Sequence, residues 1–177
     1  MSKLKNPVTA EDHAQGPADA PVTLAEYGDY ECPHCGHAYP IVKQLQEEFG
    51  DDLRLVFRNF PLANAHPHAE LAAEAAEAAA AQGKFWEMYD WLFENQADLS
   101  AANIVAGGKE LGLDVKRLAK EIEERKYQEK VRHDFSGGVR SGVNGTPTFF
   151  INGVRHDADF ELETLTEAIQ AALAEAA

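Results

Sequence analysis

The spacing of hydrophobic residues near the start of the chain predicts a strand, a helix and a second strand. Residues 22–27 (V-T-L-A-E-Y) alternate in polarity and include β-branched residues, which is typical of a strand. Between residues 33 and 49, apolar positions recur every four residues, as on one face of a helix. The stretch 53–60 (L-R-L-V-F-R-N-F) predicts the next strand. This strand–helix–strand order favours a parallel pair joined by a right-handed crossover.

The rest of the chain predicts a block of helices, then a hairpin and a last helix. The block spans about residues 66–140, where Ala- and Glu-rich sequence and apolar residues at helical spacing both favour helix. Residues 146–156 (T-P-T-F-F-I-N-G-V-R-H) predict two short strands joined by a tight Asn152-Gly153 turn. An apolar stripe over residues 162–173 predicts the final helix.

The N-terminal segment differs from the rest of the chain in composition. Residues 1–20 are polar and interrupted by Pro and Gly, and predict an arm outside the core. Residues 21–177 are enough for one domain with its own core. The sequence therefore predicts a single α/β domain, with the helical block inserted between a βαβ half and a ββα half.

Charge and hydropathy narrow the range of partners and locations. The 177-residue chain has a formal net charge of −14, which disfavours nucleic acid and anionic membranes as partners. No apolar run approaches the roughly 18 residues that span a bilayer, so direct membrane insertion is not expected. The polar N-terminus has no apolar signal core, which favours a cytoplasmic location. The alternative is a periplasmic or other extracytoplasmic protein whose signal peptide was removed, and the oligomeric state stays open.

Both cysteines lie in one short stretch, E-Y-G-D-Y-E-C-P-H-C-G-H (residues 26–37). A secreted domain stabilised by disulfides uses more cysteines at longer spacings, so this pair indicates a functional site instead of a structural disulfide. With Pro33 in the first helical turn, Cys32 lies at a helix N-terminus, where free N–H groups and the helix dipole stabilise a thiolate. Cys35 then lies on the same face, within the about 5–6 Å that a disulfide requires. A ring N–H of His34 near the Cys32 sulfur would stabilise the thiolate further.

The cysteine motif is followed, more than 100 residues later, by G-T-P-T-F-F-I-N-G. The order of elements, with C-P-H-C at the start of the first helix and G-T-P-T before the third strand, resembles the thioredoxin fold. The helical block makes residues 22–177 similar to the DsbA-like branch of the thiol–disulfide oxidoreductases. This resemblance implies that Cys32 is the nucleophile and that Cys35 resolves the mixed disulfide. It also implies protein thiols or disulfides as substrates, an unidentified redox partner, and no cofactor or metal.

The resemblance implies roles for three residues outside the motif. At the position of Glu26, related proteins often place a buried carboxylate that exchanges a proton with the second cysteine, here Cys35. A solvent-facing Glu26 is the alternative. The Thr146–Pro147 bond is expected to be cis and to lie against Cys32, with the Thr146 backbone pairing with an extended substrate segment.

The direction of electron flow stays open at this point. The dipeptide Pro33-His34 resembles the oxidising members of the family, whereas a cytoplasm would keep the pair reduced.

Two other functions also stay open. One is a glutathione-linked transferase or isomerase of the same fold, although such relatives commonly lack the paired cysteines. The other is a zinc-binding module that adds His34 and His37, or His66 and His68, to the cysteines, although a structural zinc site usually has a second, distant ligand pair. His37 is expected to be an exposed helix residue. The sequence also leaves open that the domain derives from one fused to a membrane protein.

Overall fold

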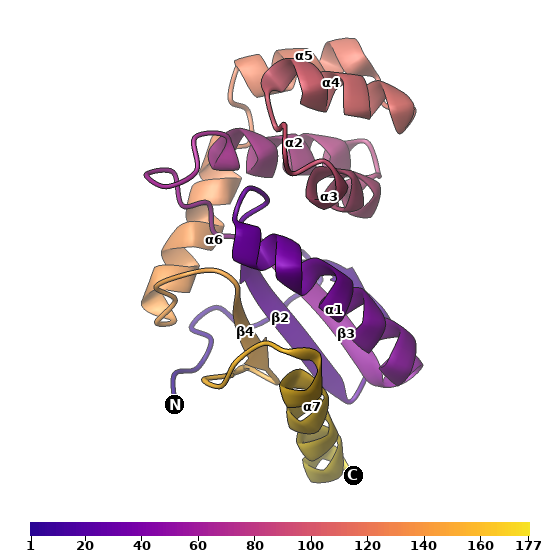
Figure 1. The fold of residues 1–177 in the computed structure, drawn as a ribbon, viewed down its shortest axis with the longest axis vertical. Helices are drawn as coiled ribbons and strands as arrows, with labels where there is room; N and C mark the ends of the chain where they lie inside the picture. Colours follow the sequence, from indigo (N-terminus) through magenta and orange to yellow (C-terminus); the bar gives the residue numbers. More distant parts are fainter. The chain divides into compact units, whose positions relative to one another are not determined.

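The computed structural model describes residues 1–177 and contains seven helices and one five-stranded sheet (Figure 1). The predicted order is confirmed: a strand, a helix and a strand precede a block of helices, and a hairpin and a helix end the chain. The residues fall into two units, each described by itself below. The sheet unit comprises residues 1–28, 37–58 and 136–177, and the helical unit comprises residues 29–36 and 59–135.

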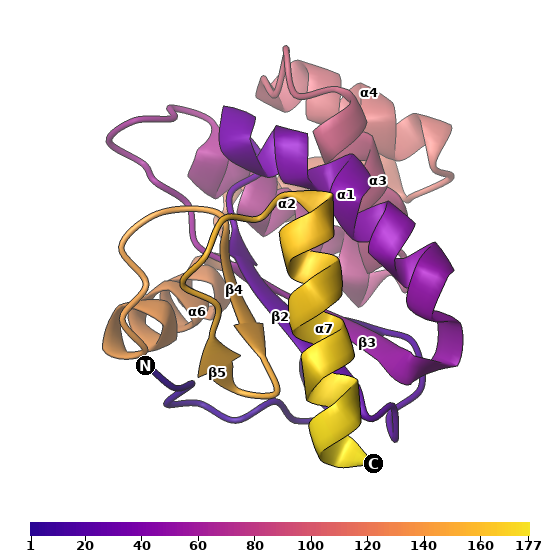
Figure 2. The same ribbon diagram turned by 60° about the horizontal axis from the view of Figure 1, so that its bottom comes forward.

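The sheet unit is built around β2 (Val22–Gly28), which lies inside a sheet of order β1-β3-β2-β4-β5. β2 pairs antiparallel with β4 (Thr148–Ile151). The other strands are β1 (His13–Gln15), β3 (Leu53–Asn59) and β5 (Val154–Arg155). Figure 2 shows α1 (Pro33–Phe49) and α7 (Leu162–Ala176) in front of this sheet. Every residue of β2 except Thr23 is buried, so this central strand has no solvent-facing side.

The turn between β4 and β5 is the predicted Asn152-Gly153 pair. Both residues have positive φ, 47° and 81°, which a type I′ hairpin turn requires. The Asn152 side chain also accepts a hydrogen bond of 2.8 Å from the backbone N–H of Thr23. The turn therefore closes the hairpin and fixes its end to β2.

The buried guanidinium of Arg58 ties the N-terminal segment to the sheet. It donates to both carboxylate oxygens of Asp12, at 2.8 and 3.1 Å, and to the Tyr27 hydroxyl at 3.0 Å. It also donates to the backbone carbonyls of Asn6 and Pro7, at 2.8 and 3.2 Å. The sequence predicted only a polar arm here, but β1 pairs with β3 and Asp12 neutralises a buried charge. The arm thus contributes to the sheet unit.

The helical unit is organised around α2 (Ala69–Ala81), which contacts α3, α4 and α5. Residues 72–79 of α2 are all buried, and all of them except Glu74 and Glu77 are alanines. The small alanine side chain lets the neighbouring helices approach α2 closely. The remaining helices are α3 (Phe85–Glu94), α4 (Ala101–Glu110), α5 (Val115–Glu123) and α6 (Gln128–Arg140), of which α6 continues into the sheet unit. None of the seven helices combines the length and apolarity needed to cross a bilayer.

We expect Asp12→Ala to lower the free energy of unfolding by about 2–4 kcal/mol, because it leaves the buried Arg58 charge without its carboxylate. Urea denaturation followed by circular dichroism measures this change. Asp19→Ala, an exposed position on the same segment, is the matched control and should change stability by less than about 0.5 kcal/mol. Equal effects of the two substitutions would contradict a structural role for the Asp12–Arg58 pair.

Candidate functional site

The cysteine motif lies at the start of α1, in the helical unit. The N–H of Gly36 donates to the carbonyl of Cys32 at 3.0 Å, so Cys32 occupies the N-cap position and Pro33 is the first helical residue. Cys32 is 3% exposed and Cys35 is fully buried, whereas Pro33 and His34 between them are exposed. The helix start therefore places the Cys32 sulfur beside free N–H groups at the positive end of the helix dipole.

Asp29 contacts both cysteines through its backbone. Its N–H points at the Cys35 sulfur at 3.5 Å, and its carbonyl accepts a hydrogen bond of 3.1 Å from the Cys32 N–H. Its side chain is fully buried and accepts hydrogen bonds from the N–H groups of Glu31 and Leu62, at 2.8 and 2.9 Å. The same carboxylate lies 2.8 Å from Nδ1 of His66. Asp29 thereby holds the loop before Cys32 against the segment that follows β3.

A second acid–histidine pair lies beside the first. Glu31 accepts a hydrogen bond of 2.7 Å from the backbone N–H of His68, and its other oxygen lies 2.8 Å from the His68 ring. The sequence suggested His66 and His68 only as remote zinc ligands, but the structure gives each a carboxylate partner. No group of three or more His, Cys, Asp or Glu side chains is arranged to hold a metal ion.

Gln96, which follows α3, holds the motif from the other side. Its amide donates to the backbone carbonyls of Tyr30 and Cys32, at 2.9 and 2.8 Å. Its oxygen would lie only 2.4 Å from a Cβ placed on Gly36. A side chain at position 36 would therefore displace the Gln96 amide and disturb its hydrogen bonds to Tyr30 and Cys32.

Sequence reasoning missed Asp29, Glu31 and Gln96. Nothing in the letters G-D-Y-E before Cys32 shows that the Asp29 side chain is completely buried. Gln96 lies 64 residues from Cys32 and belongs to no motif. The one local signal for Gln96 is the glycine after Cys35, whose close neighbour only the folded structure identifies.

The other predicted site residues belong to the sheet unit. Glu26 is 2% exposed on β2, so the alternative of a solvent-facing glutamate is wrong. The Thr146–Pro147 peptide bond is cis, and both residues line a cavity of about 270 Å³ together with residues 155–158. His37 is exposed, as expected, and its ring lies 3.1 Å from the carboxylate of Glu161.

A family model described as Thioredoxin matches residues 8–171 of the chain. Among solved structures, BdbD from Bacillus subtilis (oxidised) superposes with a TM-score of 0.88 and 24% identity, covering 98% of each chain. A thioredoxin-like oxidoreductase from Silicibacter pomeroyi DSS-3 superposes with a TM-score of 0.80 and 27% identity, covering 93% of each chain. Wolbachia pipientis alpha-DsbA1 superposes with a TM-score of 0.79 and 23% identity, covering 98% of this chain and 96% of that one. The predicted α/β class with its helical insertion is confirmed.

Curated relatives carry a different name. The Na(+)/H(+) antiporter NhaA 1 of Salinispora arenicola (strain CNS-205) is 45% identical over 163 residues, which is 92% of this chain and 25% of the antiporter. The antiporter NhaA of Herminiimonas arsenicoxydans is 42% identical over 169 residues, which is 95% of this chain and 27% of that protein. The chain thus spans about a quarter of the length of the curated relatives it matches.

We expect Gly36→Ala to lower the free energy of unfolding by about 1–3 kcal/mol, because the new methyl group overlaps the Gln96 side chain. In a protein that already carries Gln96→Ala, Gly36→Ala should lower the free energy of unfolding by less than it does in the wild type. The difference should be about 1 kcal/mol or more, since the overlapping side chain is gone. Denaturation of the four proteins of this double-mutant cycle measures the coupling. Strict additivity would show that the two residues do not meet.

Proposed function

Because the chain belongs to the thioredoxin family, we propose that it is a DsbA-like thiol–disulfide oxidoreductase that exchanges disulfides with protein thiols through Cys32 and Cys35. The observation that carries the proposal is the placement of Cys32 at the N-cap of α1, with Cys35 one turn further along the same helix. This arrangement stabilises a thiolate on the first cysteine and keeps the second within reach of it.

The proposed reduction of a substrate disulfide proceeds by two exchanges. The Cys32 thiolate attacks one substrate sulfur, an S–S bond forms between them, and the other substrate sulfur leaves as a thiolate. The Cys35 thiolate then attacks the Cys32 sulfur, which forms the Cys32–Cys35 disulfide and releases the second substrate thiolate. The substrate gains two electrons and the protein loses two; oxidation of a substrate dithiol is the reverse sequence. The Asp29 N–H, 3.5 Å from the Cys35 sulfur, favours the anionic form of that sulfur in either direction.

Three further residues have proposed roles. Burial disfavours the charged form of a carboxyl group, which suits Glu26 to taking up the Cys35 proton and returning it. The backbone of Thr146, beside Pro147 in the cavity of the sheet unit, is proposed to pair with an extended substrate segment. The exposed ring of His34 is proposed to stabilise the Cys32 thiolate and so favour the reduced form of the pair.

We expect Cys32→Ser to abolish both insulin reduction and oxidation of a reduced model protein, with a loss of at least about 100-fold, because the one remaining thiol, Cys35, is fully buried. Cys35→Ser should instead accumulate mixed disulfides between Cys32 and the substrate, visible on non-reducing gels and by mass spectrometry. His37→Ala, an exposed position on the same helix, is the control and should retain activity within about twofold.

Full activity of the Cys32→Ser protein would refute the dithiol mechanism. Conjugation of glutathione to a small electrophile without dithiol exchange would favour the transferase alternative. The Cys32–Cys35 potential, measured against a glutathione buffer, decides direction: about −120 mV marks an oxidant and about −270 mV a reductase.

The curated relatives favour a second proposal, which concerns the partner. Since these relatives are named Na(+)/H(+) antiporters and the chain matches about a quarter of their length, we propose that this domain acts next to such an antiporter and changes its thiol state. The oxidised domain, added to vesicles that contain the antiporter from the same organism, should change the rate of Na(+)/H(+) exchange. The Cys32→Ser/Cys35→Ser protein is the control, and equal exchange rates with both would contradict the proposal.

A further inference from the structure

The segment that follows β3 makes a tight turn against the Asp29 carboxylate. The carbonyl of Leu62 accepts hydrogen bonds of 2.9 Å from the N–H groups of Ala65 and His66, which closes the turn. One Asp29 oxygen, Oδ2, accepts from the Leu62 N–H at 2.9 Å and lies 2.8 Å from Nδ1 of His66. The first and last residues of the turn therefore meet at the same buried oxygen.

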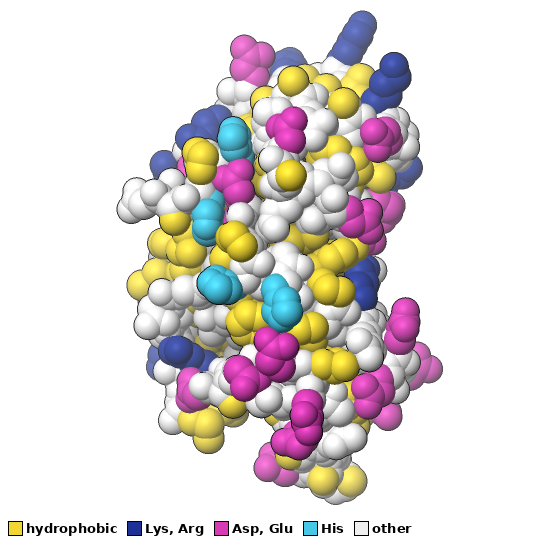
Figure 3. Space-filling view, viewed as in Figure 1, with side chains coloured by type: hydrophobic (Ala, Val, Ile, Leu, Met, Phe, Trp, Pro, Cys, Tyr) yellow, Lys and Arg dark blue, Asp and Glu magenta, His cyan; other side chains and the backbone are white.

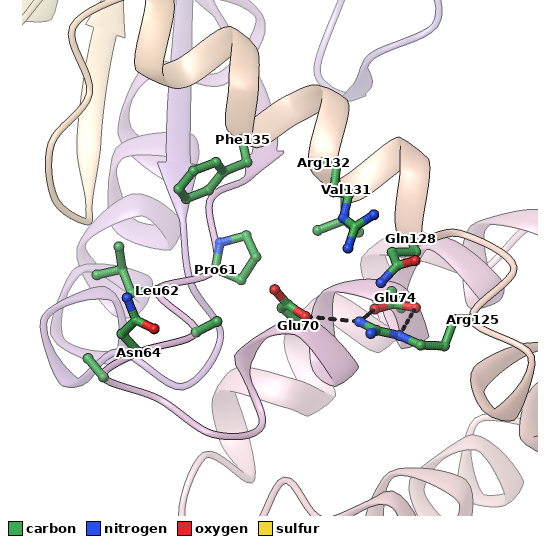
Figure 4. Close-up of a pocket in the computed structure, with 12 residues that line it drawn as sticks. Pro61, Leu62, Asn64, Glu70, Glu74, Arg125, Gln128, Val131, Arg132 and Phe135 are labelled. Carbon is green, nitrogen blue, oxygen red and sulfur yellow. Dashed lines mark hydrogen bonds and ion pairs between the residues drawn. The ribbon is translucent and has the colours of Figure 1, made fainter.

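The same turn also borders open space. Residues 61–65 line a cavity of about 470 Å³, and Figure 4 shows Leu62 and Asn64 at its edge. Residues 63–65, in the middle of the turn, are exposed. Because the middle of the turn has little packing of its own, its position depends strongly on the hydrogen bonds that its two ends make with Asp29.

The partners of Asp29 determine which group holds the proton between Asp29 and His66. Both Asp29 oxygens accept from backbone N–H groups, those of Glu31 and Leu62, which stabilises the ionised carboxylate. An ionised carboxylate can only accept hydrogen bonds, and imidazole is the stronger base of the two groups. Nδ1 of His66 therefore carries the proton and donates to Asp29. Whether the ring is neutral or an imidazolium, it places positive charge against the carboxylate.

The Asp29–His66 pair lies deeper than the other acid–histidine pair on the same segment. Histidine and acidic side chains lie side by side at the surface shown in Figure 3, so such neighbours are not unusual in this protein. The side chains of Asp29 and His66 are 0% and 18% exposed, whereas those of Glu31 and His68 are 16% and 44% exposed. Water screens the second pair more, so the charge of Asp29 acts more strongly on its surroundings.

This charge lies close to the redox pair, because Asp29 contacts both cysteines through its backbone. Its N–H points at the Cys35 sulfur at 3.5 Å, and its carbonyl accepts from the Cys32 N–H at 3.1 Å. All three residues are buried. In the proposed mechanism the reduced protein carries a thiolate, which an uncompensated Asp29 carboxylate would repel, whereas the disulfide carries no charge. Compensation of Asp29 by His66 therefore stabilises the reduced form relative to the disulfide.

We propose that His66 is a positioning residue for dithiol exchange. Its ring holds the Asp29 carboxylate in place and compensates its charge, and thereby makes the Cys32–Cys35 pair a stronger oxidant. The ring acts through Asp29, whose backbone contacts the two cysteines. This inference rests on the proposed oxidoreductase function, which it extends by assigning a residue that sets the redox equilibrium of the pair.

The test measures the equilibrium of the Cys32–Cys35 pair with reduced and oxidised glutathione at neutral pH. His66→Ala should shift this equilibrium about fivefold or more toward the disulfide, because the compensating ring is lost. His66→Asn should shift it less, since the Asn amide N–H can replace the Nδ1–H. His68→Ala, which removes the partner of the less buried Glu31 on the same segment, is the matched control and should shift the equilibrium by less than about twofold.

A double-mutant cycle tests whether His66 acts through Asp29. Asp29→Asn removes the carboxylate charge. In a protein that already carries Asp29→Asn, His66→Ala should change the glutathione equilibrium by less than about twofold, because no charge remains to be compensated. Circular dichroism of each variant checks that it is folded. A ring that only supports the fold would lower the thermal midpoint without this coupling in the redox equilibrium.

An unchanged equilibrium in His66→Ala, an equal shift in His68→Ala, or an undiminished effect in the Asp29→Asn protein would overturn the proposal. If His66→Ala does not fold, His66→Asn and His66→Gln decide: the Gln amide reaches the place of Nε2 instead of Nδ1, so equal equilibria in these two proteins would overturn it. Exchange with dithiothreitol separates this inference from the proposed function. No exchange in the wild type refutes the redox function, whereas normal exchange with an equilibrium insensitive to His66→Ala refutes the role of His66 alone.

Discussion

The proposed redox site depends on the hydrogen bonds made by the buried carboxylate of Asp29. Three hydrogen-bonding groups surround it: the N–H of Glu31, the N–H of Leu62 and the ring of His66. Its own backbone contacts both cysteines, so the position of the sulfur atoms follows from how this carboxylate is held. An ionised carboxylate without such partners would be very unfavourable in the interior, and this requirement makes the arrangement specific.

Each unit contains a polar centre of this kind, and both centres join segments far apart in the chain. In the sheet unit, Arg58 binds Asp12 46 residues away. In the helical unit, Asp29 binds His66 37 residues away. Removing one partner of a buried pair leaves an uncompensated charge, so these centres specify how the segments assemble.

The helical unit contains the cysteine motif together with the residues that hold it. Gln96 and Asp29 hold the motif from two sides. The N–H of Leu62, in the segment after β3, donates to Asp29, so two separate segments of the chain meet at this carboxylate.

The sequence by itself determined the order of the elements, the Asn152-Gly153 turn and the position of Cys32 at a helix start, because periodicity, turn chemistry and proline preference act over a few neighbouring residues. It did not reveal the edge strand in the N-terminal segment or the holding of the motif by Asp29 and Gln96. These depend on hydrogen-bond partners dozens of residues away and on burial, which no local pattern encodes. Only the tertiary structure decided that Glu26 and Asp29 lie in the interior, because burial depends on how distant segments pack around a residue.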